Sequence, residues 1–373
     1  MASIIELEKT ISGLNDKDKE LVNRLFLITT STGKLKLPEE MRPWAEKSFG
    51  SIAGVESQSI IKVLNRLTFE SALFNELRAK RPIEAKADED AIKAINESVG
   101  DPFCKPLTGT PEDSFGRVKG KYCISASNVA KYDGLHGLII FKSHNPLEFS
   151  EKELQDYFST AMKWFDKAYD SNNNAVYPFM LWNCLWRSGA SIIHGHFQLV
   201  LGEGSHYAEA EQYNKVRNEY SQKFGSDYFL DLYRAHESLG LGLEKKKIKI
   251  YTSITPEKDK EITIVSEKLG KNFVSAIYKV ANCLVKELGV NSFNMGVILP
   301  PLAKTAKRTN KANAANSLTN LAYWKGFPFI ARIVNRGALN AKTSDIGGME
   351  MYAKGNVIET DPYKVFEKVK SFF

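Results

Sequence analysis

Residues 189–202 read GASIIHGHFQLVLG, an apolar run that carries two histidines and a glutamine. In an extended strand the side chains at i, i+2 and i+4 share a face. The stretch therefore predicts a strand on which His194, His196 and Gln198 project together, while the residues between them point into apolar packing. A lone histidine here would most simply be a core residue with satisfied hydrogen bonds. Three polar groups on one buried face each need a polar partner, which indicates a functional site.

The residue types at these positions suit phosphoryl chemistry. An imidazole held by its neighbours is a good nucleophile toward phosphorus, and an amide donates hydrogen bonds to phosphoryl oxygens without titrating. Gly189 and Ser191 lie just upstream, where backbone amides could meet an anion. A cupin-type His-x-His metal site would need a glutamate soon after the second histidine. The next carboxylate is Glu203, seven residues on and past a glycine, so we set that alternative aside.

Composition bounds the class of protein. A chain of 373 residues suits two domains, or one domain built from two similar halves. The net charge of +7 suits a small anionic substrate such as a nucleotide but is too diffuse to predict a nucleic-acid partner. No run of 18 apolar residues occurs, so no membrane partner is expected. Four cysteines without framework spacing favour a reducing, cytoplasmic location; they are Cys104, Cys123, Cys184 and Cys283.

The first hundred residues read as mostly helical. Apolar residues before Pro82 fall near one face at helical spacing; they are Ile60, Ile61, Leu64, Leu67 and Phe69. Residues 83–100 are polar and helix-prone, and Gly100 closes them as a connector. We therefore predict a helical N-terminal extension over residues 1–100.

The rest of the chain repeats one pattern. KYCISASNV and HGLIIFKSH read as strands, residues 150–170 as a helix, and VYPFMLWN and SIIHGHFQLVLG as two more strands. Near the C-terminus a helix, KNFVSAIYKVANCLVKELG, precedes the strands NSFNMGVILPP and FPFIARIVNRG and a last helix from about Asp361. The sequence thus predicts a catalytic half, 101–205, and a degenerate second half, 206–373.

HGHFQLV resembles the signature strand of the histidine triad superfamily, in the variant where glutamine replaces the last histidine. That variant marks the transferase branch, which comprises galactose-1-phosphate uridylyltransferase and the dinucleoside polyphosphate and sugar-nucleotide phosphorylases. NVAKYDGLHGLIIFKSHNPLEFS resembles the upstream block of the superfamily, with Asn128 eight residues before His136 and His144 eight residues after it. The resemblance covers roughly residues 100–205 well and 290–355 loosely.

The resemblance implies a fold and a reaction. The fold would be α+β, with two histidine-triad-like motifs forming a mainly antiparallel sheet flanked by helices. Relatives in this branch are commonly homodimers or pseudo-dimers within one chain, and we expect a homodimer. His196 would attack the α-phosphorus of a nucleotide or nucleotide-sugar substrate and form a covalent nucleotidyl-histidine, which a phosphate acceptor then resolves. Gln198 would bond the phosphoryl oxygens.

The resemblance also implies supporting residues. Asn183 stands eleven residues before His194, as an active-site asparagine does in the uridylyltransferases. Ser191 takes the place of their phosphate-binding serine, and Arg187 offers bidentate phosphate geometry, although a surface ion pair is an equal alternative. Asn128 stands where the superfamily usually has an aspartate on the ribose hydroxyls. DIGGMEMYAK resembles the sugar-binding segment Gly-Tyr-Glu-Met, which would place Glu350 near sugar hydroxyls.

A structural zinc site is the main open cofactor question. Many relatives carry Cys-x-x-Cys upstream, which joins two histidines equivalent to His144 and His194. Here the segment is GDPFCKP, with Asp101 in the first cysteine position and Cys104 in the second. Asp, Cys, His and His can still hold four-coordinate zinc, whereas several phosphorylase relatives manage without metal. Both outcomes stay open.

Several functions remain in competition. A hexose 1-phosphate acceptor is favoured by Glu350, and inorganic phosphate by the lost cysteine and by the basic loop 303–312, which is either a phosphate clamp or a solvated loop. A non-catalytic nucleotide-binding protein would not need an intact His196 and Gln198. A hydrolase usually keeps the third histidine.

Overall fold

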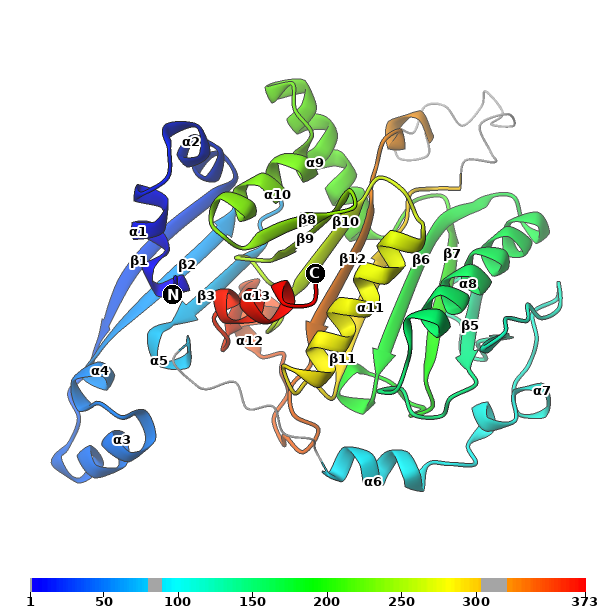
Figure 1. Ribbon diagram of the computed structural model, residues 1–373, viewed down its shortest axis with the longest axis horizontal. Coiled ribbons are helices and arrows are strands. Elements are labelled where there is room, and N and C mark those ends of the chain that lie inside the picture. The colour runs from blue at the N-terminus through cyan, green and yellow to red at the C-terminus, as the bar shows by residue number, and fades with distance from the viewer. Residues whose placement is uncertain (1, 80–88, 303–320) are drawn as a thin grey trace.

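The computed structural model describes residues 2–79, 89–302 and 321–373, so the basic loop 303–312 lies outside the described residues. Two sheets organise the chain (Figure 1). Nine strands form the larger sheet in the order β4-β5-β7-β6-β11-β12-β10-β9-β8, and four form the smaller in the order β1-β2-β3-β13. Among the described helices, none combines the length and the apolar character needed to cross a bilayer.

The larger sheet is two similar motifs joined at their β6 and β11 strands. In each motif two strands, a helix and two more strands follow along the chain, and the spatial order of the second motif mirrors that of the first. The first comprises β4 (Cys123–Ser127), β5 (Leu135–Phe141), α8 (Glu151–Ser171), β6 (Ala175–Cys184) and β7 (His196–Glu203). The second comprises β9 (Ile248–Thr252), β10 (Ile262–Ser266), α11 (Lys271–Lys286), β11 (Phe293–Ile298) and β12 (Phe329–Asn335), with β8 (Gly242–Lys245) at the edge. The predicted α+β fold with a mainly antiparallel sheet is confirmed.

Helices α8 and α11 lie across the same face of this sheet (Figure 1). The predicted capping box of α8 is present, because the Ser150 hydroxyl accepts from the Glu153 amide and the Glu153 carboxylate accepts from the Ser150 amide. Strand residues that point at α8, such as Phe197 and Leu199, are fully buried. Each such side chain contributes about 1.5–3 kcal/mol to folding. Alternate residues are thereby left to project from the opposite, open face.

The N-terminal region is not the purely helical extension that was predicted. Residues 57–75 form β2 (Ser57–Asn65) and β3 (Ser71–Asn75), which pair with β1 (Phe26–Lys34) and with β13 (Gly355–Ile358). Ile60, Ile61 and Leu64 lie in β2, because that strand is paired along both edges and is rich in β-branched residues, which favour strands. Leu67 and Phe69 lie in the turn that follows. The helices of residues 2–79 belong to the same region: α1 (Leu7–Ser12), α2 (Asp16–Leu25), α3 (Arg42–Phe49), α4 (Ile52–Glu56) and α5 (Glu76–Ala79). Helix α6 (Glu89–Glu97) lies instead below the larger sheet (Figure 1), where the Ile95 carbonyl is 3.0 Å from His144 Nε2.

The remaining helices connect or cover the sheets. Short α7 (Pro106–Gly109) precedes β4, and α12 (Gly348–Tyr352) precedes β13. Helices α9 (Ala208–Phe224) and α10 (Tyr228–Ser238) link the two motifs. The last helix, α13 (Pro362–Lys370), begins after Asp361, whose side chain accepts from the Tyr363 amide as an N-cap. Because β13 joins the N-terminal sheet, the two ends of the chain build one unit.

The strand predicted over 191–202 is shorter than expected. It begins at His196, and residues 191–195 approach it as an irregular segment. Gly195 explains the irregularity, since a Cβ there would lie 2.4 Å from the Phe141 ring. Its backbone still bonds residues 141 and 144 of the neighbouring segment. His194 therefore does not follow the strand alternation, and its side chain is directed elsewhere.

Candidate functional site

His196 and Gln198 lie side by side on the open face of the first motif, as predicted. Gln198 pairs with Leu138 on β5 and with Leu181 on β6, and His196 pairs with Ile140. The His196 ring is buried, and the Phe103 ring meets it edge-on at a centroid distance of 5.1 Å. Apolar neighbours on both sides thus hold a polar pair in a site of low dielectric.

Hydrogen bonding fixes the tautomer of His196. Its Nδ1 lies 2.8 Å from the carbonyl oxygen of His194. A carbonyl can only accept, so Nδ1 carries the hydrogen and Nε2 keeps a free lone pair. Burial lowers the pKa of His196 against the opposing effect of that carbonyl bond, which keeps the ring neutral at pH 7. The geometry thus prepares Nε2 as a nucleophile.

A second histidine fixes the direction of the Gln198 amide. His136 Nδ1 accepts from the Tyr132 backbone amide at 3.0 Å, so its Nε2 carries the hydrogen and donates to Gln198 Oε1 at 3.1 Å. Burial lowers the pKa of His136, so this neutral arrangement persists at pH 7. With Oε1 occupied, the two N–H bonds of Gln198 are directed elsewhere. The sequence placed His136 in the upstream block but did not identify this role.

Asn128 lies beside this pair at the end of β4. Its Nδ2 is 3.1 Å from His136 Nε2, and its Oδ1 accepts from the Ala130 amide at 3.2 Å. Since His136 Nε2 carries a hydrogen and donates to Gln198, it cannot accept from Asn128 Nδ2, so Asn128 is a neighbour of this pair rather than a hydrogen-bond partner. The Tyr132 ring stacks on His136 at 4.5 Å and is itself largely exposed. Asn128 therefore lies at the rim of the site, next to an exposed aromatic ring.

The four residues considered for zinc converge in one cluster, with one potential ligand atom from each within 4.8 Å of the others. His194 Nε2 lies 2.8 Å from the carbonyl of Phe141, and His144 Nε2 lies 3.0 Å from the carbonyl of Ile95. Both rings therefore donate from Nε2 and turn Nδ1 lone pairs toward each other, 3.0 Å apart.

The other two members complete this cluster. Cys104 Sγ lies 3.3 Å from His144 Nδ1 and 3.5 Å from His194 Nδ1. Asp101 Oδ1 lies 3.5 Å from His194 Nδ1, and Oδ2 of the same carboxylate is buried with no hydrogen-bond partner. A cation between the two facing lone pairs and the orphaned carboxylate oxygen would satisfy all three. The donor set of two nitrogens, one sulfur and one oxygen fits a tetrahedral metal such as zinc.

The loop that leads to His194 is held in a strained conformation by the second motif. Leu185 has φ 64° and Gly189 has φ 90°; the left-handed region is costly for leucine. Ser292 donates to the Cys184 carbonyl at 2.8 Å, and Asn294 donates to the Ser188 carbonyl at 2.9 Å. Asn183, at the end of β6, precedes this loop. Residues from both motifs therefore shape the approach to the site.

Three other predicted site residues, Arg187, Gly189 and Ser191, lie on the loop that leads to His194. Arg187 donates to the carbonyls of Ala341 and Thr343, at 3.5 and 2.8 Å, so it anchors segment 337–347 to the loop. Ser191 and Gly189 are exposed on the surface of the loop, consistent with access to solute. No described contact ties Ser191 to His196.

Glu350 is engaged by its own helix. Its Oε2 accepts from the Gly347 amide at 2.8 Å, and Oε1 accepts from the Val357 amide at 3.4 Å. Burial alone would raise its pKa, but these amides hold the pKa below the usual glutamate range. The carboxylate thus caps α12, a structural role that the sequence motif did not indicate.

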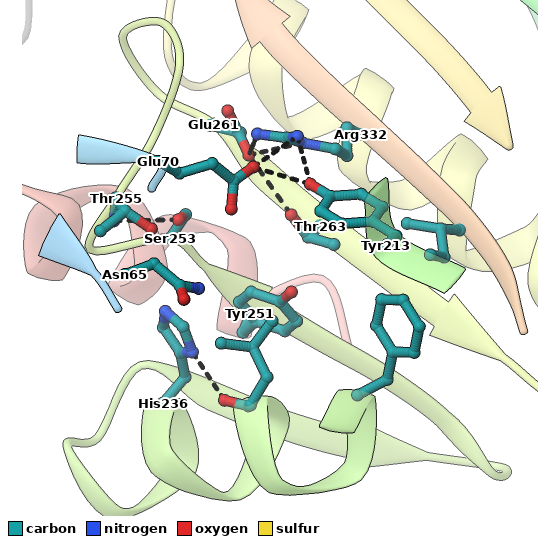
Figure 2. Close-up of a pocket in the computed structure, with 13 residues that line it drawn as sticks. Asn65, Glu70, Tyr213, His236, Tyr251, Ser253, Thr255, Glu261, Thr263 and Arg332 are labelled. Carbon is teal, nitrogen blue, oxygen red and sulfur yellow. Dashed lines mark hydrogen bonds and ion pairs between the residues drawn. The ribbon is translucent and has the colours of Figure 1, made fainter. Parts of the chain in front are cut away.

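The same open face carries a different cluster in the second motif (Figure 2). Arg332 on β12 bonds Glu70 at 2.9 Å and Glu261 at 2.8 Å. Tyr213 donates to Glu70 at 2.7 Å and lies 2.5 Å from Arg332. Glu209 also pairs with the guanidinium. These groups and their neighbours leave a cavity of about 20 Å³, room for about one water molecule.

The cluster is electrostatically tight. Burial opposes the charge on Arg332, but the surrounding carboxylates raise its pKa well above the usual value. Burial raises the pKa of Glu261 to about 7, against the attraction of Arg332. The partners come from the β2–β3 turn, from α9 and from the residue before β10, so this cluster fastens the N-terminal sheet onto the second motif. No local sequence pattern marks this cluster, because the partners of Arg332 are distant from it in the chain.

No protein-family model and no curated protein sequence matches the chain. Solved structures do. An ADP-glucose phosphorylase from Arabidopsis thaliana with bound ADP-glucose superposes with a TM-score of 0.60 at 14% identity, covering 83% of this chain and 98% of the other. A uridylyltransferase superposes with a TM-score of 0.54 at 15% identity, covering 70% of this chain and 88% of the other. The chain has the fold of the uridylyltransferases.

A GalT-like protein from Arabidopsis thaliana matches as well, with a TM-score of 0.60 at 13% identity over 83% of this chain and 98% of the other. The fold implied by the resemblance of HGHFQLV is therefore confirmed. At these identities the uridylyltransferase fold alone is shared. The chemistry has to be argued from the residues of the site.

Proposed function

We propose that the chain is a nucleotidyltransferase that works through a covalent nucleotidyl-histidine on His196. The donor is a nucleotide sugar or a dinucleoside polyphosphate, and the acceptor is a phosphate. One observation carries the proposal: a neutral, buried imidazole presents a free Nε2 next to an amide whose N–H bonds are free to donate. The bound ADP-glucose in the structural neighbour supports the donor class.

Nucleotidyl transfer through His196 takes two steps. Nε2 of His196 attacks the α-phosphorus, an N–P bond forms, and the P–O bond to the departing sugar phosphate or nucleotide breaks. The leaving group is itself a phosphate, so no strong general acid is required. A phosphate oxygen of the acceptor then attacks the same phosphorus and releases neutral His196. Gln198 donates to the non-bridging oxygens in both steps.

The acceptor is either a hexose 1-phosphate or inorganic phosphate. Glu350 was the residue that favoured a sugar acceptor, and its carboxylate instead caps α12. That contact weakens the case for a hexose 1-phosphate and favours inorganic phosphate. A direct comparison of the two acceptors decides between them.

The reaction is tested by half-reaction exchange. The protein is incubated with a panel of α-labelled adenine, uracil and guanine nucleotide sugars and dinucleotides, without acceptor. The proposal predicts an acid-labile labelled protein, which either inorganic phosphate or a hexose 1-phosphate discharges. His196→Gly should not label at all. A protein that no donor labels, or a His196→Gly variant that still labels, contradicts the proposal.

We further propose that Asp101, Cys104, His144 and His194 hold a structural zinc ion. The two facing Nδ1 atoms and the orphaned Asp101 oxygen support this site. The ion would fix the segment before β4 against the start of β7, and it would supply rigidity rather than chemistry. Such an ion would hold the His194 carbonyl that orients His196.

Metal content is the test of that site. The purified protein should contain about one zinc ion per chain, and Cys104→Ser should lose it and unfold at a lower temperature. Cys283→Ser is the matched control, because that buried cysteine lies on α11. A wild-type protein that stays metal-free after incubation with zinc would rule out the proposed site.

A further inference from the structure

We propose that Asn294 and Arg336, both in the second motif, are positioning residues that fix which way the Asn183 amide faces. Together they turn the N–H bonds of Asn183 toward the phosphoryl group that His196 attacks. The inference rests on the proposed function of that site. It assigns a task in the reaction to a motif that carries no histidine in its strands.

Arg336 directly follows β12. Its Nε and Nη2 bond the two oxygens of Asp345 at 2.6 and 3.0 Å, a bidentate pair that holds the guanidinium plane. Arg336 and Lys258 both hold the pKa of Asp345 below its usual range despite burial, so the pair is charged at pH 7. The remaining nitrogen, Nη1, donates to Asn294 Oδ1.

A guanidinium can only donate, so this contact decides the orientation of Asn294. Its oxygen must face Arg336, and its Nδ2 must face the other way. Nδ2 then donates to Asn183 Oδ1 at 2.7 Å and to the Ser188 carbonyl at 2.9 Å. Both hydrogens of Asn294 and its oxygen are thereby engaged. The amide has no other orientation that satisfies all three partners.

The orientation of Asn294 also fixes that of Asn183. Its oxygen accepts from Asn294, so its two N–H bonds are directed away from Asn294. Asn183 and Asn294 are register partners in the central β6–β11 pair. Asn183 lies two residues from Leu181, the register partner of Gln198, so it shares the open face with Gln198. The amide hydrogens of Asn183 are thus available on the catalytic face.

This relay matches the one on the opposite side of His196. There, the Tyr132 amide fixes the tautomer of His136, which binds Gln198 Oε1 and frees its N–H bonds. The side-chain amides of Asn183 on β6 and Gln198 on β7 are therefore each fixed by a hydrogen bond to their own oxygen atom. Both then offer donors to a phosphoryl group, as stabilisation of a developing negative charge requires.

The test replaces Asn294 with aspartate. Asn294→Asp keeps the shape and the contact with Arg336 but cannot donate to Asn183, which would then rotate and turn its oxygen toward the phosphoryl group. The rate of nucleotidyl-His196 formation should fall by about 10²-fold, the lower end of the range that one lost donor costs. Arg336→Met frees Asn294 to rotate, so this variant should also form nucleotidyl-His196 more slowly than the wild type.

A double-mutant cycle separates positioning from a structural role, because Asn294 also holds Ser188. In an Asn183→Ala background, Asn294→Asp should change the rate by less than about threefold. If Asn294→Asp lowers the rate as much in the Asn183→Ala background as it does in the wild type, Asn294 acts on the loop and the inference is overturned. Asn75→Asp is the matched control, since Asn75 also donates to an amide oxygen but lies on β3. Its labelling rate should equal that of the wild type.

Nucleotide affinity distinguishes this inference from the proposed function. The dissociation constants for ADP and UDP are measured by calorimetry for wild type and for Asn294→Asp. A wild type that binds nucleotide without forming an adduct contradicts nucleotidyl transfer, while at least fivefold weaker binding by Asn294→Asp still supports the relay. Equal affinity and equal labelling in the two proteins would overturn the relay and leave the proposed function intact.

Discussion

The two motifs use the same face of one sheet for different purposes. In the first motif, that face carries His196 and Gln198 among neutral partners, and every ring or amide there is oriented by a hydrogen bond. In the second motif, the corresponding face carries Arg332, ringed by carboxylates from the β2–β3 turn, from α9 and from the residue before β10. One face is arranged for phosphoryl transfer, and the other receives the protein's own N-terminal sheet.

The contrast shows that two similar motifs in one sheet can serve different functions. A phosphoryl site needs free donors and an unprotonated nucleophile. A docking surface needs the opposite, a buried charge with all its partners satisfied. The central pair of Asn183 and Asn294 is where the two surfaces meet.

The largest effect is expected at Arg332. Arg332→Leu leaves several carboxylates without their cation, and the free energy of unfolding should fall by about 3–5 kcal/mol. Chemical denaturation measures it, with Arg234→Leu as the control, because Arg234 is exposed and pairs with Asp231 at 3.5 Å. That control should cost less than about 1 kcal/mol. Equal losses in the two variants would show that the cluster does not fasten the N-terminal sheet.

The next largest effect is expected at Gln198, and it should appear in rate rather than in stability. Gln198→Glu keeps an oxygen toward His136 but replaces the phosphoryl donor with a negative charge. Adduct formation should slow by about 10²–10³-fold. Gln155→Glu, on the exposed side of α8, is the matched control and should label normally. A Gln198→Glu protein that labels like the control would remove Gln198 from the mechanism.

A smaller effect is expected from acid at His236, which lines the Arg332 cavity. Burial lowers its pKa to about 4, against the bond to the Leu232 carbonyl. Since an unfolded histidine titrates near 6.5, the unfolded chain binds more protons below that pH, and stability falls as pH falls. This group alone should cost about 2 kcal/mol between pH 6.5 and pH 5. His236→Gln should flatten the pH dependence by about that amount, and an unchanged slope would contradict the assignment.

The sequence predicted the site better than it predicted the N-terminal fold. His196 and Gln198 are two residues apart, so strand alternation alone places them together. Ile60 and Ile61 fit a helical pattern equally well, and only pairing of β2 with β1 and β3 makes them strand residues. The parallel pairing of β3 with β13 joins the two ends of the chain. The periodicity of a short stretch of sequence does not reveal which distant strands pair with each other.

The missed functional residues share one property. His136, Asn294 and Arg336 act by orienting another side chain, so their role depends on which atom faces which partner. The spacing of Asn128 and His136 was visible in the sequence, but the tautomer was not. Arg332 was visible as a charge, whereas Glu70 and Glu261 lie far from it in the chain.

The central claim is that the nucleotidyl group is carried by His196 in the first motif. Peptide mapping by mass spectrometry, after brief reaction with a donor that labels the protein, tests it most directly. The account predicts one nucleoside monophosphate on the peptide that contains residues 189–202, with fragment ions that place it on His196. An adduct on any other residue, or turnover of donor with no adduct on that peptide, would contradict the account.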